Sequence, residues 1–131
     1  MKYILMMHGG KADWEGYAKW SKEDLERNVA FMRNFSKDLK DAGVFVETRG
    51  LAWPQEAKLV RAENDGTPVT DGVFPESKEF LAGYWIVDVE SPHETYSIAA
   101  RLSAMPGPGG KPGNVPIEVR QVLGSHSDLG I

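Results

Sequence analysis

Two stretches of the sequence are apolar on both sides of an extended chain. The run KYILMMH at residues 2–8 is almost continuously apolar, and GYWIVDV at residues 83–89 alternates large apolar residues between its two faces. Such runs are typical of central strands that are covered on both faces. The chain must therefore supply or recruit a cover for each face of the sheet that these strands build.

One cover is an amphipathic helix that follows the first strand. Ser21 is a suitable N-cap, acidic residues follow it in the first turn, and Gly43 is a typical C-terminal stop. Apolar residues recur between these ends at helical spacing: Leu25, Val29, Met32, Phe35, Leu39 and Ala42. This stripe predicts a helix from about Lys22 to Ala42 that packs one face against a sheet.

The remaining patterns complete a strand–helix–strand order in each half of the chain. VFVETRGL at 44–51 and IEVRQVL at 117–123 read as further strands, and residues 9–20 as an irregular connection. SPHE at 91–94 has capping-box spacing with proline at the first helical position, which predicts a short helix. KLVRA and TPVT flank the turn residues Asn64-Asp65-Gly66 and predict an inserted β-hairpin.

The resulting order is β-α-β, hairpin, β-α-β. It predicts an α+β fold of the ferredoxin-like, split βαβ kind, with the hairpin inserted between its halves. No linker or internal repeat divides the chain, so we expect one domain over residues 1–124. Residues 125–131 are expected to form a loosely held tail.

This topology predicts an uncovered sheet face. Both crossovers are right-handed, so both helices lie on the same side of the sheet. The opposite face would expose a larger apolar patch than the few hundred Å² usual for monomers. A second copy packed sheet against sheet is the simplest cover, and the alternative is that the inserted hairpin folds over this face. We expect a homodimer.

Composition limits the chemistry that is open to the chain. The 131 residues, 41% apolar and 26% charged, suit one soluble domain. The net charge of −4, with basic and acidic residues intermixed, speaks against a nucleic-acid partner. The chain has no cysteine, which excludes disulfides, thiolate metal sites and cysteine nucleophiles. No run approaches the roughly 20 apolar residues of a membrane span, and none resembles a signal peptide, so we expect a cytoplasmic protein without membrane contact.

The stretch TDGVFPESKEFLAGYW at residues 70–85 is rich in residues with special conformational roles. Asp71 and Gly72 suit a tight turn, the two apolar residues that follow suit an anchor, and Pro75-Glu76 suits the start of a helical turn. Gly83 would allow a close backbone approach before Tyr84. Each feature has a structural explanation, and a ligand-facing role at the rim of a cleft is the alternative.

Together with KYILMMHG, LKDAGVFVETRGL and IEVR, this stretch resembles the YCII-related proteins. More narrowly, it resembles the branch named for an Asp-Gly-Pro-Phe motif, although Val73 stands where that branch has proline. The resemblance covers nearly the whole chain. It implies a ferredoxin-like domain that pairs into a dimeric α/β barrel. Most such proteins have no known function, and the few related enzymes use a histidine–aspartate pair with the histidine on the first helix. The predicted first helix here contains no histidine.

His8 is the candidate for acid–base chemistry. It ends the first strand, where a side chain can point out of the sheet into a cleft, and histidine titrates near neutral pH. Asp13, Glu47 or Asp71 could orient it, and Arg49 could clamp an anionic group. The alternatives are a hydrogen-bonded histidine at a strand end and an arginine in an ordinary surface ion pair. The catalytic candidates are therefore His8, Asp71 and Glu47.

Aromatic and charged residues near the expected loops are candidates for ligand binding. They are Arg49, Trp53, Tyr84, Glu76 and Trp14. Aromatic side chains in such positions wall apolar pockets, but they also cap cores and line dimer seams. The three histidines lie far apart without metal-binding spacing, so neither a metal nor a cofactor is expected.

Two functions fit these residues. The first is a cofactor-free acid–base enzyme, of isomerase or lyase type, that acts on a small organic molecule. The second is a non-catalytic module that binds a small ligand or a regulatory partner. A His8 side chain within hydrogen-bond reach of an acidic side chain in an apolar cleft would favour the enzyme. A His8 that faces bulk solvent, or a cleft filled by Trp and Phe, would favour the binding module.

Overall fold

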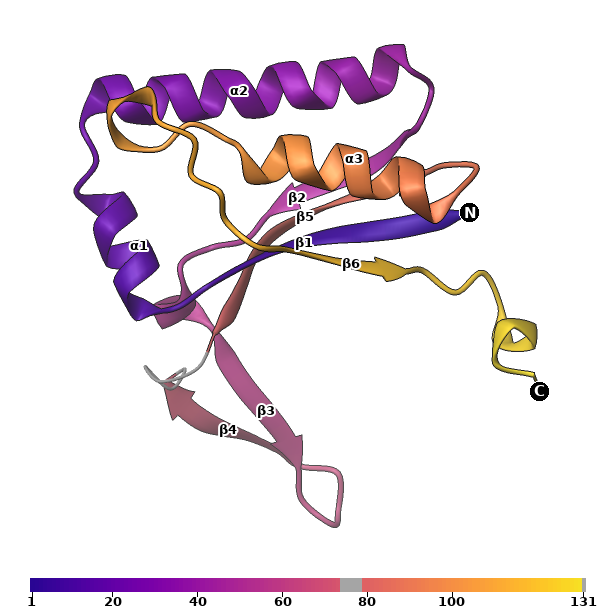
Figure 1. Ribbon diagram of the computed structural model, residues 1–131. Helices are drawn as coiled ribbons and strands as arrows, with labels where there is room; N and C mark the ends of the chain where they lie inside the picture. Colours follow the sequence, from indigo (N-terminus) through magenta and orange to yellow (C-terminus); the bar gives the residue numbers. More distant parts are fainter. Residues whose placement is uncertain (74–78, 131) are drawn as a thin grey trace.

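A computed structural model describes residues 1–73 and 79–130, apart from the side chains of residues 71–73 and 126 (Figure 1). Four strands form one antiparallel sheet in the order β2-β5-β1-β6. Their bounds are β1 Lys2–Gly9, β2 Phe45–Gly50, β5 Phe80–Asp88 and β6 Ile117–Gln121. Helices α2 (Lys22–Asp41) and α3 (Pro92–Ser103) cover one face. The predicted α+β fold is confirmed, and the strand order is consistent with the ferredoxin-like pattern.

The two covering helices begin where their caps predict. The Ser21 hydroxyl accepts a hydrogen bond of 3.1 Å from the Asp24 N–H at the start of α2. The Ser91 hydroxyl accepts one of 3.3 Å from the Glu94 N–H at the start of α3. Gly43 follows α2 with a φ of 76°, a conformation that glycine adopts without strain. Local capping chemistry therefore sets both ends of α2.

A short helix, α1 (Lys11–Ala18), replaces the irregular connection that we predict for residues 9–20. The Asp13 carboxylate accepts a hydrogen bond of 2.7 Å from the Gly10 N–H and so caps this helix. None of the α1 residues is fully buried. The helix lacks the apolar stripe that reveals α2 in the sequence, because its partly buried residues are two aromatic and two charged ones, Trp14, Tyr17, Lys11 and Glu15.

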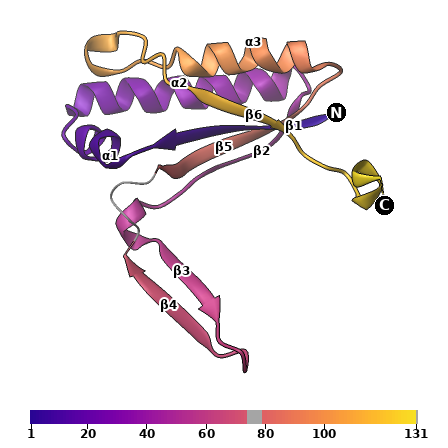
Figure 2. The same cartoon turned by 60° about the horizontal axis from the view of Figure 1, so that its bottom comes forward.

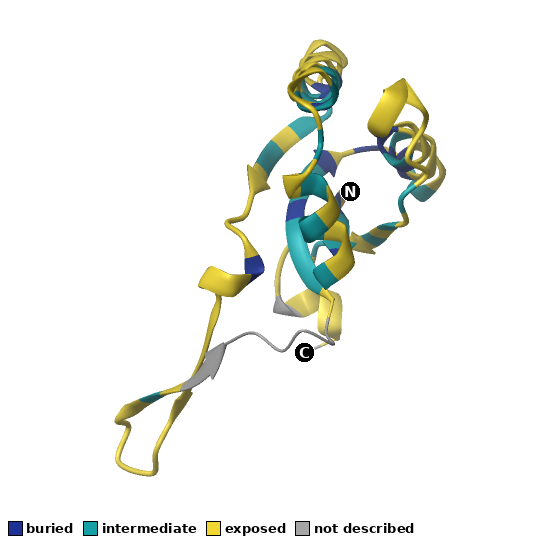
Figure 3. Cartoon of the chain, turned by 90° about the vertical axis from the view of Figure 1, so that its left-hand side faces the viewer, coloured by how far each residue is buried: buried dark blue, intermediate teal, exposed yellow. Residues whose placement is uncertain are grey.

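The core lies between the sheet and the two covering helices (Figure 3). Phe35 on α2 packs edge-on against Trp85 on β5, with ring centroids 5.4 Å apart. The Trp85 indole N–H donates a hydrogen bond of 3.0 Å to the Ser36 hydroxyl. The fully buried apolar side chains include Leu5, Phe35, Val87 and Leu102. Large side chains on the helix-facing side of β1 and β5 thus fix the sheet against α2 and α3.

Gly83 sets the distance between β5 and β2. A Cβ atom at this position would lie 3.0 Å from the Arg49 carbonyl oxygen. The glycine therefore permits the close backbone approach that we predict for this position.

The inserted hairpin forms as predicted, as a separate two-stranded sheet of β3 (Lys58–Ala62) and β4 (Pro68–Val73). Asp65 accepts a hydrogen bond of 2.9 Å from the Thr67 N–H in its turn. Figures 1 and 2 show the hairpin extending from the body on the side away from the helices. Every residue of β3 is exposed. The hairpin therefore does not fold over the uncovered face of its own sheet.

Three short 3-10 helices complete the described residues: η1 Pro54–Glu56, η2 Pro108–Gly110 and η3 His126–Leu129. The second lies in the proline- and glycine-rich segment, and the third lies in the tail. Within the described part of the chain, no helix combines the length and apolar character needed to cross a bilayer.

Candidate functional site

The face of the sheet opposite α2 and α3, here called the open face, has an apolar centre. Strand register places Tyr84 beside Met6 and Ile86 beside Ile4 on the two central strands. Each of these four side chains is only partly buried within one chain. The centre of the open face therefore combines apolar surface with partial access to solvent.

The two edge strands give the open face alternating charges. In one row across the sheet, Arg49 on β2 and Glu118 on β6 stand at opposite ends. In the next row, Glu47 stands on β2 and Arg120 on β6. A basic and an acidic side chain thus face each other across the apolar centre in both rows, with the two signs exchanged between rows.

His8 lies at the end of β1 and contacts an acidic residue on the open face. Its Nε2 atom is 3.2 Å from the Glu118 Oε1 atom. The imidazole is 30% exposed and the Glu118 side chain 46% exposed. Nε2 itself is screened from solvent and makes no well-aligned hydrogen bond within the described residues. Glu118 therefore lies within ion-pair distance of His8 Nε2 without accepting a hydrogen bond from it.

Glu118 is not among the partners that the sequence suggests for His8. Of those suggested partners, Asp13 caps α1 and Glu47 bonds to Tyr84. Two features of the sequence identify Glu118 as a neighbour of His8. The alternation in IEVR predicts that its residues form a strand, and the strand order of the split βαβ pattern places that strand beside β1. Asp71 lies in β4 with a side chain that is not described, and Glu76 lies outside the described residues.

Tyr84, Glu47 and Arg49 form a second polar group on the same face. The Tyr84 hydroxyl donates a hydrogen bond of 2.8 Å to the Glu47 Oε2 atom. This hydrogen bond is the main cause of a raised pKa of Tyr84, with smaller contributions from burial and from the negative charge of Glu47. The nearby positive charge of Arg49 acts in the opposite direction on this pKa. The phenol is thus held in its neutral form as a hydrogen-bond donor.

Arg49 is well exposed and is held by its own strand. It lies 3.8 Å from Glu47 and donates a hydrogen bond of 2.7 Å to the Thr48 carbonyl. Arg120 similarly lies 3.9 Å from Glu118. Long, exposed ion pairs of this kind contribute little to stability. Both guanidinium groups therefore remain able to exchange these contacts for an anionic partner.

The predicted ligand residues Trp14 and Trp53 do come together, in an aromatic cluster with Tyr17 and Trp20. The ring centroids of Trp14 and Trp53 are 5.9 Å apart, and those of Tyr17 and Trp53 are 5.8 Å apart. Tyr17 and Trp20 lie 4.9 Å apart. These distances are those of rings in direct contact, so the cluster joins α1 to the segment before η1. Trp53 keeps 39% of its surface exposed.

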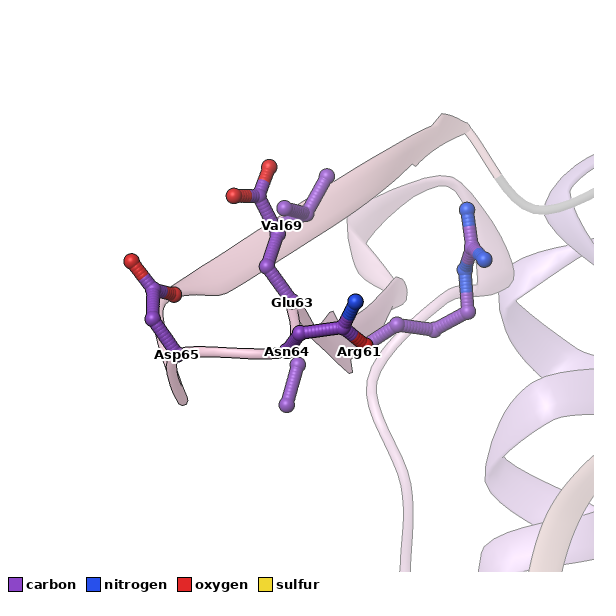
Figure 4. A pocket seen from close by; sticks show the side chains of 6 residues that line it. Arg61, Glu63, Asn64, Asp65 and Val69 are labelled. Atoms are coloured by element: carbon purple, nitrogen blue, oxygen red, sulfur yellow. The ribbon is translucent and has the colours of Figure 1, made fainter.

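A hollow of about 520 Å³ lies at the turn of the hairpin (Figure 4). Its lining comes only from hairpin residues: Arg61, Ala62, Glu63, Asn64, Asp65 and Val69. Figure 4 shows Arg61 extending away from the carboxylates of Glu63 and Asp65. The pKa of Asp65 is lowered, chiefly by its hydrogen bond from the Thr67 N–H. Asp65 therefore stabilises the turn of the hairpin. Among the predicted site residues whose side chains are described, none lines this hollow.

Metal ligation finds no support in residues 1–73 and 79–130. Among these residues, no three His, Cys, Asp or Glu side chains are close enough together to hold a metal ion. The polar groups of the open face form pairs instead.

The fold and the open face define a small α+β protein with ionisable side chains on the sheet face that its helices leave free. Residues 1–107 match the model of the YCII-related domain, and the chain belongs to this family. It is also 32% identical over 107 residues to an uncharacterized protein of Rhizobium meliloti (strain 1021). This similarity covers 74% of the chain and 86% of the relative.

Proposed function

We propose that this chain is a cofactor-free acid–base enzyme, of isomerase or lyase type, whose site lies on the open face. One observation carries the proposal: His8 Nε2 lies 3.2 Å from a Glu118 carboxylate oxygen. A histidine this close to an acidic side chain, beside the apolar centre of the open face, supports the enzyme over the binding module. The substrate class is a small organic molecule with an anionic group, because exposed arginines stand at two corners of the same face.

The role of each residue follows from its contacts. With Nε2–H directed at Glu118, a neutral His8 keeps the lone pair on Nδ1 and can accept a proton there. Glu118 acts as the positioning residue, since its carboxylate selects this tautomer and stabilises the imidazolium that forms. Tyr84 is a neutral hydrogen-bond donor beside the apolar centre. Arg120, which lies 3.9 Å from Glu118, would hold the anionic group of the substrate.

The proposal includes a homodimer in which two open faces meet. A half-turn about an axis parallel to the strands would bring β2 of one copy over β6 of the other. Arg49 would then face the second copy's Glu118, and Glu47 would face its Arg120. The alternating charges therefore make the open face complementary to itself, as an isologous interface requires. Covering the face would also exclude water and strengthen the interactions of His8 with its partners.

Proton exchange tests the acid–base proposal even while the substrate is unidentified. Small carboxylates and aromatic acids that raise the melting temperature are incubated with the protein in D₂O, and deuterium entry at carbon is followed by NMR. We expect exchange with the wild type and a loss of about 10²- to 10⁴-fold in His8→Asn. Glu118→Gln should also slow exchange, whereas Glu26→Gln, exposed on α2 on the other side of the sheet, is the matched control and should not.

A different outcome would favour the binding module. Its specific support is the aromatic cluster, because Trp53 offers exposed ring surface beside Trp14 and Tyr17. In that case a ligand would stabilise the wild type without any exchange. Stabilisation would persist in His8→Asn and would be lost in Trp53→Ala. This pattern would overturn the enzymatic proposal.

A further inference from the structure

The β3–β4 hairpin leaves its apolar side chains uncovered. All five residues of β3 are exposed, and Leu59 and Val60 are 47% and 61% exposed. The hairpin is not hydrogen-bonded into the four-stranded sheet. An isolated two-stranded hairpin is at best marginally stable in water, so a surface that packs against these side chains would stabilise it.

The position of the hairpin selects which surface it can reach. It follows β2, an edge strand, through η1 and extends on the side of the open face, away from the helices (Figures 1 and 2). The helix layer of its own chain is therefore out of reach. Anything packed on the open face would lie beside the hairpin.

The length of the hairpin matches the thickness of a second sheet. A five-residue strand spans about 17 Å, at about 3.3 Å per residue. Two sheets that pack face to face lie about 10 Å apart. A hairpin of this length, following the end of β2, is long enough to reach past a second sheet stacked on the open face.

We propose that the β3–β4 hairpin is an arm that packs the face of β3 bearing Val60 against a second copy of this chain and walls the site between the open faces. This inference rests on the dimer in the proposed function. It adds that each site is built from both copies: one supplies His8 and Glu118 on its sheet, and the other supplies a hairpin at the rim. The arm accounts for the insertion between the two halves of the fold.

A single spin label tests the arm. The chain contains no cysteine, so Val60→Cys offers one unique site for a nitroxide. Tyr96→Cys is the matched control, because Tyr96 is 56% exposed on α3, on the opposite side of the sheet. Sedimentation of the labelled proteins gives the dimer dissociation constant. Spectra are recorded at concentrations tenfold above and tenfold below it.

We expect the Val60→Cys label to be immobilised in the dimer and mobile in the monomer, with the Tyr96→Cys label equally mobile in both. If the label at position 60 prevents dimer formation and the label at position 96 does not, this result would equally support the proposal that the hairpin contacts the second copy. A mobile position-60 label in a stable dimer would overturn the arm and leave the open-face dimer standing. A wild type that stays monomeric at every concentration would overturn both, whereas the acid–base role of His8 has its own test in proton exchange.

A pair of variants provides a second measurement. Leu59→Ser with Val60→Thr removes apolar contact from β3 while keeping residues that strands accept. We expect this double variant to weaken the dimer at least tenfold, and Tyr96→Ser to leave the dissociation constant unchanged. Equal dissociation constants for the double variant and the wild type would contradict the proposal.

Discussion

The Tyr84 hydroxyl donates a hydrogen bond of 2.8 Å to Glu47 Oε2, across the boundary between β5 and β2. Removing the phenolic proton would place a phenolate beside a carboxylate and would abolish this bond. The pKa of Tyr84 is raised for this reason first, and burial and the charge of Glu47 add to the shift. The protonation of Tyr84 is therefore linked to the stability of the pairing between β5 and the edge strand β2.

This linkage predicts a loss of stability at alkaline pH. Because the pKa of Tyr84 is higher in the folded chain than in the unfolded one, its contribution is complete below about pH 10, the ordinary pKa of tyrosine. The contribution disappears as the pH rises through the folded pKa. Urea unfolding between pH 8 and 11.5 should show a steeper alkaline fall in the wild type than in Tyr84→Phe. Tyr96→Phe is the control and should follow the wild type; parallel curves for all three proteins would exclude the linkage.

The close approach of β5 and β2 predicts an asymmetry between two paired glycines. Gly83 and Gly50 are register partners. A Cβ at Gly83 would lie 3.0 Å from the Arg49 carbonyl oxygen, whereas nothing lies within 4 Å of one at Gly50. We expect Gly83→Ala to lower the free energy of unfolding by about 1–3 kcal/mol, because the strands must separate to admit the methyl group. Gly50→Ala should change it by less than about 0.5 kcal/mol. Equal urea midpoints for the two variants would contradict this account of Gly83.

The elements that the sequence predicts well have local signals. Ser21 and Gly43 bound α2, Ser91 and Pro92 start α3, and the Asn64-Asp65-Gly66 turn joins the hairpin strands. Each signal acts within a few residues of the element that it defines. The sequence does not predict α1, because the polar and aromatic residues of this short helix do not recur as an apolar stripe at helical spacing. Its cap is an acidic residue inside the helix, Asp13, rather than a residue before it.

The candidate site is predictable only in part because it depends on strand order. His8 is identifiable from its place at the end of a central strand. Its acidic neighbour comes from the last strand, and only the pairing of β6 with β1 brings Glu118 to it. Glu47 meets Tyr84 instead of His8, since β5 lies between β2 and β1. The residue types in the sequence therefore identify the ionisable groups. The strand order determines which of these groups lie close together in the fold.

The apolar centre of the open face predicts a sensitive position for self-association. Ile86 lies on a central strand, partly buried, with Ile4 beside it. Ile86→Asp would place a charge in the interface of the proposed dimer, where burying an isoleucine would be worth about 1.5–3 kcal/mol in each copy. We expect its dimer to dissociate at least tenfold more readily in sedimentation experiments. Tyr96→Asp, on the opposite side of the sheet, should sediment as the wild type does. A wild-type chain that sediments as a monomer at micromolar concentration would refute the interface.

The proline- and glycine-rich segment before β6 is tied to α2 by two hydrogen bonds. The Asn28 side-chain N–H donates one of 3.1 Å to the Pro106 carbonyl, and the Gly109 N–H donates one of 3.1 Å to Asp24 Oδ1. Asn28 is 1% exposed, so its amide cannot be replaced by water without rearrangement.

Asn28→Ala should therefore lower the free energy of unfolding by about 1–3 kcal/mol, because it leaves the Pro106 carbonyl without this donor. Asn34→Ala is the matched control, with the same substitution at an exposed position of the same helix. It should change the stability by no more than about 0.5 kcal/mol, since alanine also favours the helix. Urea midpoints separate the two variants. If Asn28→Ala is no less stable than Asn34→Ala, the hydrogen bond to Pro106 does not hold the segment.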